Sequence, residues 1–420
     1  MQKAFLAATA ILALAFASPL AARTPEEVAE AALKIAPVWD GHNDVPWQLR
    51  LRKRNVIGEF DFADTLDTAD AAAARQVMHT DIGRMRKGRV GAQFWSVYVP
   101  ASMTDEQSVQ AVLEQVDVTR RLIARYPADL QLATSAAEVE RAMKAGRIAS
   151  LLGMEGGHAI GQSLAVLRQM HGLGVRYMTL THSKSLPWAD SATDKPQHGG
   201  LTDFGRDVVR EMQRIGMLVD LSHVSEATMN DALDVSKAPV IFSHSGARAV
   251  GTHPRNVPDA VLDRLKDNGG IVMIVTLPAF VSDAVRDWSS RQAGEKARLE
   301  ALHTGNPDAA KAALADWEKA NPIPRATIPQ VADHIDRVVR RAGIDHVGLG
   351  GDFDGMDQVV EGLEDVSKYP ALFVELARRG YSQADLEKIS SRNMVRVLRA
   401  AEAYTASVRS DPPIENPARF

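Results

Sequence analysis

The chain has 420 residues, of which 45% are hydrophobic and 24% charged, so it is long and apolar enough to fold around a large core, and disorder is excluded. Its 49 basic and 53 acidic residues give a net charge of -4, which leaves no excess of positive charge for nucleic-acid phosphates. The absence of cysteine excludes disulfides, thiolate metal sites and cysteine nucleophiles.

The first 22 residues have the layout of a secretory signal. Lys3 precedes an apolar run from Ala4 to Phe16, and small residues follow before Arg23. The run is shorter than the roughly 20 residues of a membrane span, so we expect a cleaved signal (residues 1–22) and no membrane span after it. An uncleaved anchor is the alternative. Export without cysteine points to a bacterial periplasmic or secreted protein with residues 23–420 as its mature domain.

Eight β-rich runs, each ending in polar or glycine residues, alternate with segments of helical periodicity. The runs are Ile35–Trp39, Val90–Val99, Ile148–Met154, Arg176–Thr181, Met217–Ser222, Pro239–Ser243, Gly270–Val275 and His346–Gly350. The helical segments include Ser108–Arg125, Ala136–Ala145, Leu201–Ile215, Glu226–Val235, Pro258–Asp267 and Pro329–Ala342. This alternation predicts an α/β fold, a closed (β/α)8 TIM barrel forming a single catalytic domain.

Two segments interrupt the alternation. Val281–Pro324, after the seventh strand, is rich in alanine and charged residues and predicts an insertion with a charged surface helix. This insertion is either a lid over the site or a solvated excursion with no part in catalysis. Pro370–Thr405 predicts the final barrel helix followed by a C-terminal helix on the outside.

The strand ends carry the residues that suggest chemistry. The first strand leads into His42 and Asp44, a His-x-Asp pair whose side chains share one side of an extended chain. Glu155 follows the third strand between glycines, where a desolvated carboxylate needs a partner. His223 and His244 follow the fifth and sixth strands. A single histidine in such a place is usually structural, but these strand ends meet at one barrel mouth, which favours a shared metal site.

Five nitrogen and oxygen ligands without sulfur suit zinc, with manganese, cobalt or iron as alternatives. One catalytic zinc takes only three protein ligands, so five predict two metal ions per chain. Glu155 is the expected bridge because a carboxylate offers two oxygens, with His42 and Asp44 completing one site and His223 and His244 the other. Two ions about 3.5 to 4 Å apart trap a hydroxide and polarise a carbonyl, which predicts metal-assisted amide hydrolysis.

Three further residues are candidates for catalysis and substrate binding. Asp352, after the last strand, is placed to take a proton from the attacking water and pass it to the leaving nitrogen; a structural role in its glycine-rich turn is the alternative. His182, after the fourth strand, is either a donor to the oxyanion or a sixth metal ligand. Arg255 offers a forked cation to a substrate carboxylate, although an arginine at a helix start is often only a surface residue.

These blocks resemble the renal, or membrane, dipeptidase family of zinc peptidases within the amidohydrolase-like barrels. They recur in order over nearly all of the mature chain. The residues that carry the resemblance are Asp40-Gly-His-Asn-Asp44-Val-Pro-Trp47, Met154-Glu-Gly-Gly-His158, Thr179-Leu-Thr-His182, Pro187-Trp-Ala-Asp190, Val240-Ile-Phe-Ser-His244-Ser, Arg255-Asn-Val-Pro-Asp259, Val331-Ala-Asp-His-Ile335, Gly350-Gly-Asp-Phe-Asp-Gly355 and Glu361-Gly-Leu-Glu-Asp-Val-Ser-Lys-Tyr-Pro370.

The resemblance implies the same roles. In the family, the counterparts of His42 and Asp44 bind one zinc, those of His223 and His244 bind the other, and that of Glu155 bridges them. The counterparts of His182 and Asp352 assist at the scissile peptide, and that of Arg255 holds the substrate.

The family also indicates what the enzyme acts on and where this chain differs. Members cleave dipeptides, tolerate a C-terminal D-residue, and some open carbapenem rings; many are dimeric, so the resemblance allows a homodimer. This chain departs from the mammalian pattern in having no cysteine for a subunit-linking disulfide, and in Thr276-Leu-Pro278 where polar and aromatic residues are expected.

The leading hypothesis is an exported dizinc dipeptidase in which a metal-bridging hydroxide attacks the peptide carbonyl of a small dipeptide substrate. One alternative is a related metal-dependent amidohydrolase acting on N-acyl amino acids. Another is a catalytically silent binding protein on the same barrel, which is expected to lack a ligand or the acid of the last strand. All of those residues are present here.

Overall fold

The computed structural model describes residues 23–73 and 75–417, so the predicted signal (residues 1–22) lies outside the described residues. The described chain contains one parallel sheet. Its strands are β1 (Val38–Asn43), β2 (Val90–Ser96), β3 (Leu130–Leu132), β4 (Ile148–Glu155), β5 (Val175–Thr179), β6 (Leu218–Asp220), β7 (Ile241–Ser245), β8 (Ile271–Ile274) and β9 (Val347–Leu349). Eight of them run in the order β2-β1-β9-β8-β7-β6-β5-β4, and β2 also pairs with β4, which closes a barrel. The predicted TIM barrel is confirmed.

β3 is the strand that the sequence pattern does not predict. It pairs with the first part of β4, with Leu130 opposite Ile148. β5 pairs with the later part of the same strand, with Leu152 opposite Val175. A three-residue strand is too short for an alternating pattern to stand out from its surroundings. It adds to the edge of β4 and leaves the eight-stranded ring unchanged.

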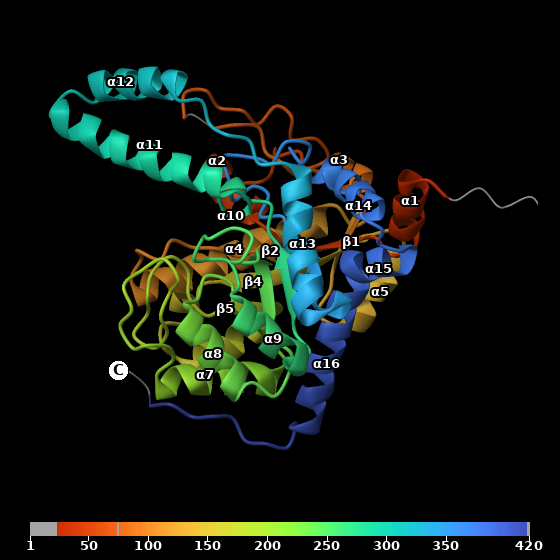
Figure 1. Cartoon of the computed structure of the whole chain (residues 1–420). Coiled ribbons are helices and arrows are strands. Elements are labelled where there is room, and N and C mark those ends of the chain that lie inside the picture. Colours follow the sequence, from red (N-terminus) through yellow and green to blue (C-terminus); the bar gives the residue numbers. More distant parts are fainter. Residues whose placement is uncertain (1–22, 74, 418–420) are drawn as a thin grey trace, which may run out of the picture.

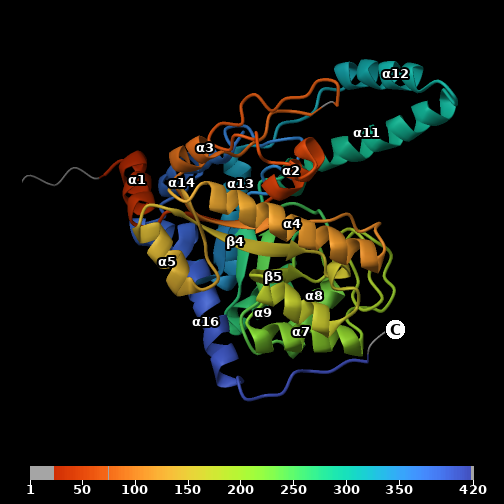
Figure 2. The same ribbon diagram turned by 180° about the vertical axis from the view of Figure 1, so that it is seen from behind.

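Helices surround the barrel (Figures 1 and 2). They are α1 (Pro25–Ile35), α2 (Val45–Lys53), α3 (Ile82–Lys87), α4 (Asp105–Arg125), α5 (Ala136–Lys144), α6 (Leu164–Gly172), α7 (Asp203–Ile215), α8 (Glu226–Val235), α9 (Asp259–Asn268), α10 (Pro278–Val281), α11 (Asp283–Leu302), α12 (Pro307–Ala320), α13 (Ile328–Ala342), α14 (Tyr369–Arg378), α15 (Gln383–Glu387) and α16 (Asn393–Ser407). Short turns of 3-10 or π type cover Gly157–Ile160, Ile344–His346, Val366–Lys368 and Lys388–Arg392. No helix in the described part is both long and apolar enough to cross a bilayer.

The first predicted strand, Ile35–Trp39, is wrong at both ends. Thr24 and Glu27 form a capping box that starts α1, and this helix continues to Ile35, whose side chain is exposed. The strand begins at Val38 and runs on to Asn43, because its pairing with β2 and β9 continues beyond the apolar run. As a result His42 lies within β1. His244 likewise lies within β7 rather than after it.

The barrel interior is filled, and its two ends differ. Trp39, Phe94 and Tyr177 are fully buried members of one cluster inside the ring. The same cluster includes Val139 of α5 and Leu398 of α16, so these helices cover the end of the barrel where the strands begin. Any site must therefore lie at the other end, where the strands finish.

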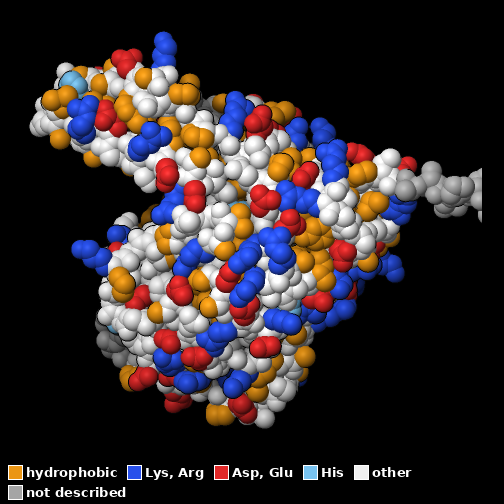
Figure 3. All heavy atoms as spheres, viewed as in Figure 1, with side chains coloured by type: hydrophobic (Ala, Val, Ile, Leu, Met, Phe, Trp, Pro, Cys, Tyr) orange, Lys and Arg blue, Asp and Glu red, His pale blue; other side chains and the backbone are white. Residues whose placement is uncertain are grey.

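The insertion after β8 forms a helical arm, α11 and α12 (residues 283–320), which projects from the body (Figures 1 and 2). The prediction of a single surface helix is corrected to a hairpin of two. Trp288 and Trp317 meet at its base with ring centres 5.9 Å apart, and Leu299 and Ala310 are buried along it. Hydrophobic side chains are visible on the arm in Figure 3, and acidic and basic ones are interspersed over the body.

The C-terminal region packs on the outside of the barrel, as predicted for Pro370–Thr405, but as α14, α15 and α16 rather than two helices. The tail beyond α16 is tied to α7 through the fully buried Glu211. This carboxylate accepts hydrogen bonds from Arg168 (2.8 Å), from Arg214 (2.7 Å) and from the backbone N–H of Ile414 (3.2 Å).

Candidate active site and metal centre

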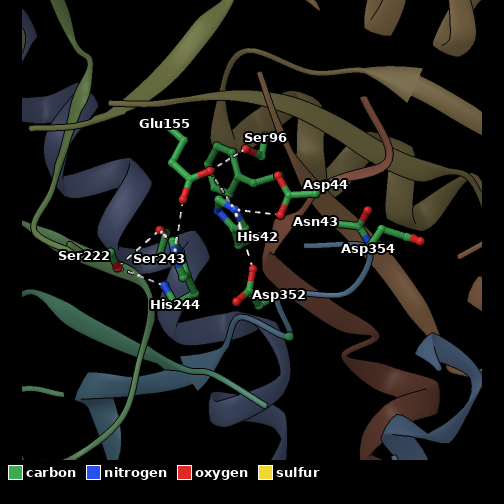
Figure 4. A network of polar contacts seen from close by, with 12 residues as sticks. His42, Asn43, Asp44, Ser96, Glu155, Ser222, Ser243, His244, Asp352 and Asp354 are labelled. Carbon is green, nitrogen blue, oxygen red and sulfur yellow. Dashed lines mark hydrogen bonds and ion pairs between the residues drawn. The ribbon is translucent and has the colours of Figure 1, made fainter. Parts of the chain in front are cut away.

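The C-terminal ends of five strands bring together the predicted metal ligands and the predicted catalytic acid, Asp352. His42 comes from β1, Glu155 is the last residue of β4, His244 lies in β7, and Asp352 follows β9 (Figure 4). His223 enters from the turn after β6. Each of these side chains is buried or nearly so, although all are polar. Buried polar groups of this kind need partners of complementary charge.

Glu155 lies at the centre of this cluster. Its Oε1 is 2.9 Å from His223 Nε2, 3.5 Å from His244 Nε2 and 3.6 Å from His182 Nε2. Its Oε2 is 3.4 Å from His42 Nε2. Burial alone would raise the pKa of Glu155, but the imidazoles, His42 first, bring it well below its ordinary value. The carboxylate is therefore ionised, and its two oxygens face different sets of histidines.

His42 faces two further carboxylates. Its Nε2 is 3.2 Å from Asp44 Oδ2 and 4.0 Å from Asp352 Oδ1. Burial is the first cause that raises the pKa of Asp352, to about 8, and the nearby charges of Asp44 and Glu155 raise it further against the opposing effect of His42. Three buried carboxylates thus share a small volume, and a cation in their midst would relieve their mutual repulsion.

The donor atoms fit divalent metal ions. Ligand atoms within 4.8 Å of one another occur in three overlapping groups: His42, Glu155 and His244; Glu155, His182 and His223; and His42, Asp44 and Asp352. The Nε2 atoms of His223 and His244 are 3.1 Å apart, and burial lowers the pKa of both imidazoles well below its ordinary value. Neutral imidazoles and ionised carboxylates are the ligand forms that zinc and related metals require.

Backbone pairing and strain set the directions of these side chains. The N–H of Asp352 donates to the carbonyl of His42 (3.2 Å), and the N–H of Asp44 donates to the carbonyl of Phe353 (3.0 Å), so the turn after β9 is joined to the end of β1. His223, Asp352 and Asp354 have φ of 69°, 63° and 66°. Left-handed backbone is uncommon for residues other than glycine and is concentrated at functional sites.

A cavity of about 340 Å³ opens over the cluster. Its other walls are formed by Trp47, Tyr98, Leu277, Phe280, Arg255 and His182. All of the residues that line it lie outside the arm. This arrangement gives the barrel mouth a confined, polar floor and largely apolar walls.

Arg255 is buried in this cavity wall rather than lying on the surface. It is 2% exposed, its guanidinium lies 5.3 Å from the centre of the Phe280 ring, and its Nη2 donates to His244 Nε2 at 2.7 Å. Its Nε and Nη1 are buried and have no hydrogen-bond partner among the residues that the structure describes. Burial lowers the pKa of Arg255 to about 10, which leaves it charged at neutral pH. Two unpaired donors on a buried cation suit an anionic group in the cavity.

His182 lies beside the cluster, where both of its predicted roles remain open. Its ring stacks on that of His223 with centres 4.2 Å apart and lies 4.7 Å from that of Tyr98. Burial lowers its pKa to about 4, so the ring is neutral and offers one N–H donor.

Several polar residues of the site have no role in the sequence analysis. Ser96 donates to Glu155 Oε2 at 3.1 Å, the Tyr177 hydroxyl is 2.9 Å from His42 Nδ1, and Ser243 Oγ is 2.9 Å from His244 Nδ1. Each lies on a strand of the barrel. Alternation along a strand indicates which side chains share a face, but it does not identify which ligand a given hydroxyl contacts.

Comparison with known proteins agrees with this geometry. The model of the "Membrane dipeptidase (Peptidase family M19)" family matches residues 26–411. The chain belongs to this family. It is a metal-dependent dipeptidase with a TIM-barrel fold.

Individual relatives support the assignment of this dipeptidase. It is 43% identical over 385 residues to dipeptidase tcpJ of Claviceps purpurea, covering 89% of this chain and 79% of the relative. It is 40% identical over 406 residues to an uncharacterized dipeptidase of Schizosaccharomyces pombe, covering 93% and 87%. The crystal structure of the probable dipeptidase PvdM from Pseudomonas aeruginosa shares the fold, with a TM-score of 0.76, 22% identity and coverage of 90% and 99%. Because both sequence relatives are fungal, the bacterial origin stays a prediction.

Proposed function

We propose that this dipeptidase holds two divalent cations, zinc foremost, and hydrolyses the peptide bond of dipeptides, including those with a C-terminal D-residue. The observation that carries the proposal is the position of Glu155, whose two oxygens face separate histidines at 2.9 Å and 3.4 Å. One carboxylate that faces two ligand sets is the arrangement expected of a bridge between two metals.

Five residues would hold the metals. Glu155 would bridge, His42 and Asp44 would complete one site, and His223 and His244 would complete the other. Bound there, two cations would lower the pKa of water and polarise the peptide carbonyl.

The remaining residues act on the substrate. Asp352 lines the cavity, and the positive charge of bound cations would keep it ionised despite its raised pKa. It would then take a proton from the attacking water and pass it to the leaving amide nitrogen. His182, a neutral imidazole, donates a hydrogen bond to the oxyanion that develops on the carbonyl. Arg255 binds the C-terminal carboxylate through its unpaired Nε and Nη1 donors. One arginine, Arg255, in the wall of a cavity of about 340 Å³ favours a small substrate with one free carboxylate.

The test is hydrolysis of Gly-D-Ala and L-Ala-D-Ala before and after complete chelation, with metal content measured on the same samples. We expect activity to disappear with the metal and to return when two equivalents of zinc are restored. Activity that survives complete metal removal would falsify the proposal. Equal turnover of dipeptides with a free and an acetylated amino group would favour the alternative amidohydrolase activity on N-acyl amino acids.

We further propose that the chain is exported by the predicted signal (residues 1–22). Fractionation of expressing cells and N-terminal sequencing of the mature protein test this: a chain that retains Met1 in the cytoplasm contradicts it. Light scattering of the purified protein tests the homodimer that the family resemblance allows.

A further inference from the structure

A buried acid lies behind the proposed metal centre and does not line the cavity. Asp220, the last residue of β6, is fully buried. Its Oδ1 accepts the backbone N–H groups of Ser222 (3.0 Å) and Ser243 (2.8 Å). Its Oδ2 accepts the hydroxyls of Thr179 (2.5 Å) and Ser243 (2.6 Å). All four contacts bring a donor to the carboxylate, which is an acceptor only.

These contacts fix the direction of the Ser243 hydroxyl. A serine has a single O–H donor, and Ser243 has two acceptors near it, Asp220 Oδ2 at 2.6 Å and Ser222 Oγ at 3.4 Å. The proton goes to Asp220, because that contact is much shorter and its acceptor is a carboxylate. Ser243 Oγ is also 2.9 Å from His244 Nδ1. Because the serine proton points to Asp220, Oγ must accept there, and the Nδ1 of His244 must carry the hydrogen. The chain Asp220, Ser243, His244 is therefore a directed relay (Figure 4 shows its last two members).

A contact on the other side of the ring indicates the same tautomer independently. Arg255 has only donors, and its Nη2 is 2.7 Å from His244 Nε2. Nε2 must therefore present a lone pair. A neutral imidazole with its proton on Nδ1 and its lone pair on Nε2 satisfies both contacts. The same form binds a metal through Nε2, and a metal bound there would use this lone pair and replace the Arg255 contact.

We propose that Asp220 and Ser243 are positioning residues that hold His244 in the Nδ1-protonated form and aim its Nε2 lone pair at the metal centre. The proposal rests on the metal sites proposed above. Histidine ligands commonly donate their second N–H to a carboxylate or carbonyl. Here the Ser243 hydroxyl lies between the imidazole and the Asp220 carboxylate, so Asp220 acts on His244 only through the serine.

The other histidines of the centre lack this arrangement. The Nδ1 atoms of His182 and His223 are buried without a hydrogen-bond partner among the described residues. His42 Nδ1 faces the Tyr177 hydroxyl, which is able to donate or to accept. Loss of the relay should therefore weaken the metal site that contains His244 and spare the other.

The test measures zinc affinity, not activity. Chelator-stripped protein is titrated with zinc against a competing chromophoric chelator. We expect Ser243→Ala and Asp220→Asn to weaken one of the two zinc equivalents by roughly 10- to 100-fold. Thr179→Val is the matched control: it removes a hydroxyl from the same Asp220 oxygen without touching His244, and its affinities should stay within about twofold of wild type. Ser243→Thr keeps a hydroxyl and should restore binding.

A second readout follows the tautomer directly. In ¹⁵N NMR spectra of the zinc-free protein, His244 should show a protonated Nδ1 in wild type and Thr179→Val, and a change in Ser243→Ala. Zinc affinities of Ser243→Ala and Asp220→Asn equal to that of Thr179→Val overturn the relay. Wild-type protein that binds no zinc overturns the metal centre instead, so the two failures are distinguishable.

Discussion

Replacement of Arg255 by methionine should remove the preference of the enzyme for substrates that have a free C-terminal carboxylate. The guanidinium is buried, faces the cavity, and has two nitrogens, Nε and Nη1, without a partner among the described residues, so a substrate carboxylate is its expected partner. Hydrogen bonds between charged groups contribute about 1.5 kcal/mol each at the lower end of their range. Two of them give about 3 kcal/mol, or a loss of roughly 100-fold in kcat/KM.

The assay compares L-Ala-D-Ala with its C-terminal amide in wild type and variant. Wild type should prefer the dipeptide by roughly 100-fold, and Arg255→Met should prefer it by less than about threefold, because each change removes the same interaction. Arg255→Lys keeps the charge but not the fork and should fall between the two. Zinc content is measured alongside, since Arg255 also contacts His244. If Arg255→Met retains the wild-type preference for the dipeptide, this role of Arg255 is wrong.

Three further outcomes test the fold. Gly350→Ala should lower the free energy of unfolding by about 3 kcal/mol in denaturant, because the added Cβ would lie 1.9 Å from the backbone carbonyl oxygen of Ser243. Gly348→Ala is the control: its Cβ would lie 3.1 Å from the Ile271 side chain, and it should cost about 1 kcal/mol. Glu211→Gln should cost about 2 kcal/mol at pH 7. Burial would raise the pKa of Glu211, but hydrogen bonds from its two arginines lower it. The ionised carboxylate therefore stabilises the fold above about pH 4.5, and the stability difference between wild type and Glu211→Gln should disappear as the pH falls through the lowered pKa. A stability difference that grows in acid contradicts this role of Glu211. Replacing residues 290–315 of the arm by a Gly-Ser linker should leave kcat/KM within about threefold of wild type, since the cavity lies outside the arm; a loss above about tenfold would restore the lid hypothesis.

The barrel was predictable because its strands are buried on both faces and therefore appear as separate apolar runs. The residues at which the strands end were harder to predict. β1 and β7 extend through His42 and His244, since pairing with neighbouring strands continues where the apolar run stops. The arm was predicted only as one charged helix. Its two helices bury few side chains, so neither has the strong apolar stripe that marks a barrel helix.

The candidate site was predicted from the position of polar residues at the strand ends more than from any sequence motif. The rule that strand ends meet at one mouth is enough to predict that residues as distant as Asp44 and Asp352 lie together, and the structure brings them to one cavity. Their roles as ligand and base stay predictions. Asp220 and Ser243 could not be predicted from the sequence, because the relay depends on which hydroxyl of β7 faces which carboxylate of β6. No spacing within one strand encodes that contact.

The left-handed backbone at His223, Asp352 and Asp354 matters for attempts to raise the thermal stability of this enzyme. Each such position costs of order 1 kcal/mol that glycine would recover, so these are places where replacement relaxes the chain. A laboratory selection scored only on survival of heating would favour those replacements, and at His223 and Asp352 it would remove the metal ligand and the base proposed above. Improvement should instead be sought away from the mouth, with turnover scored in every round.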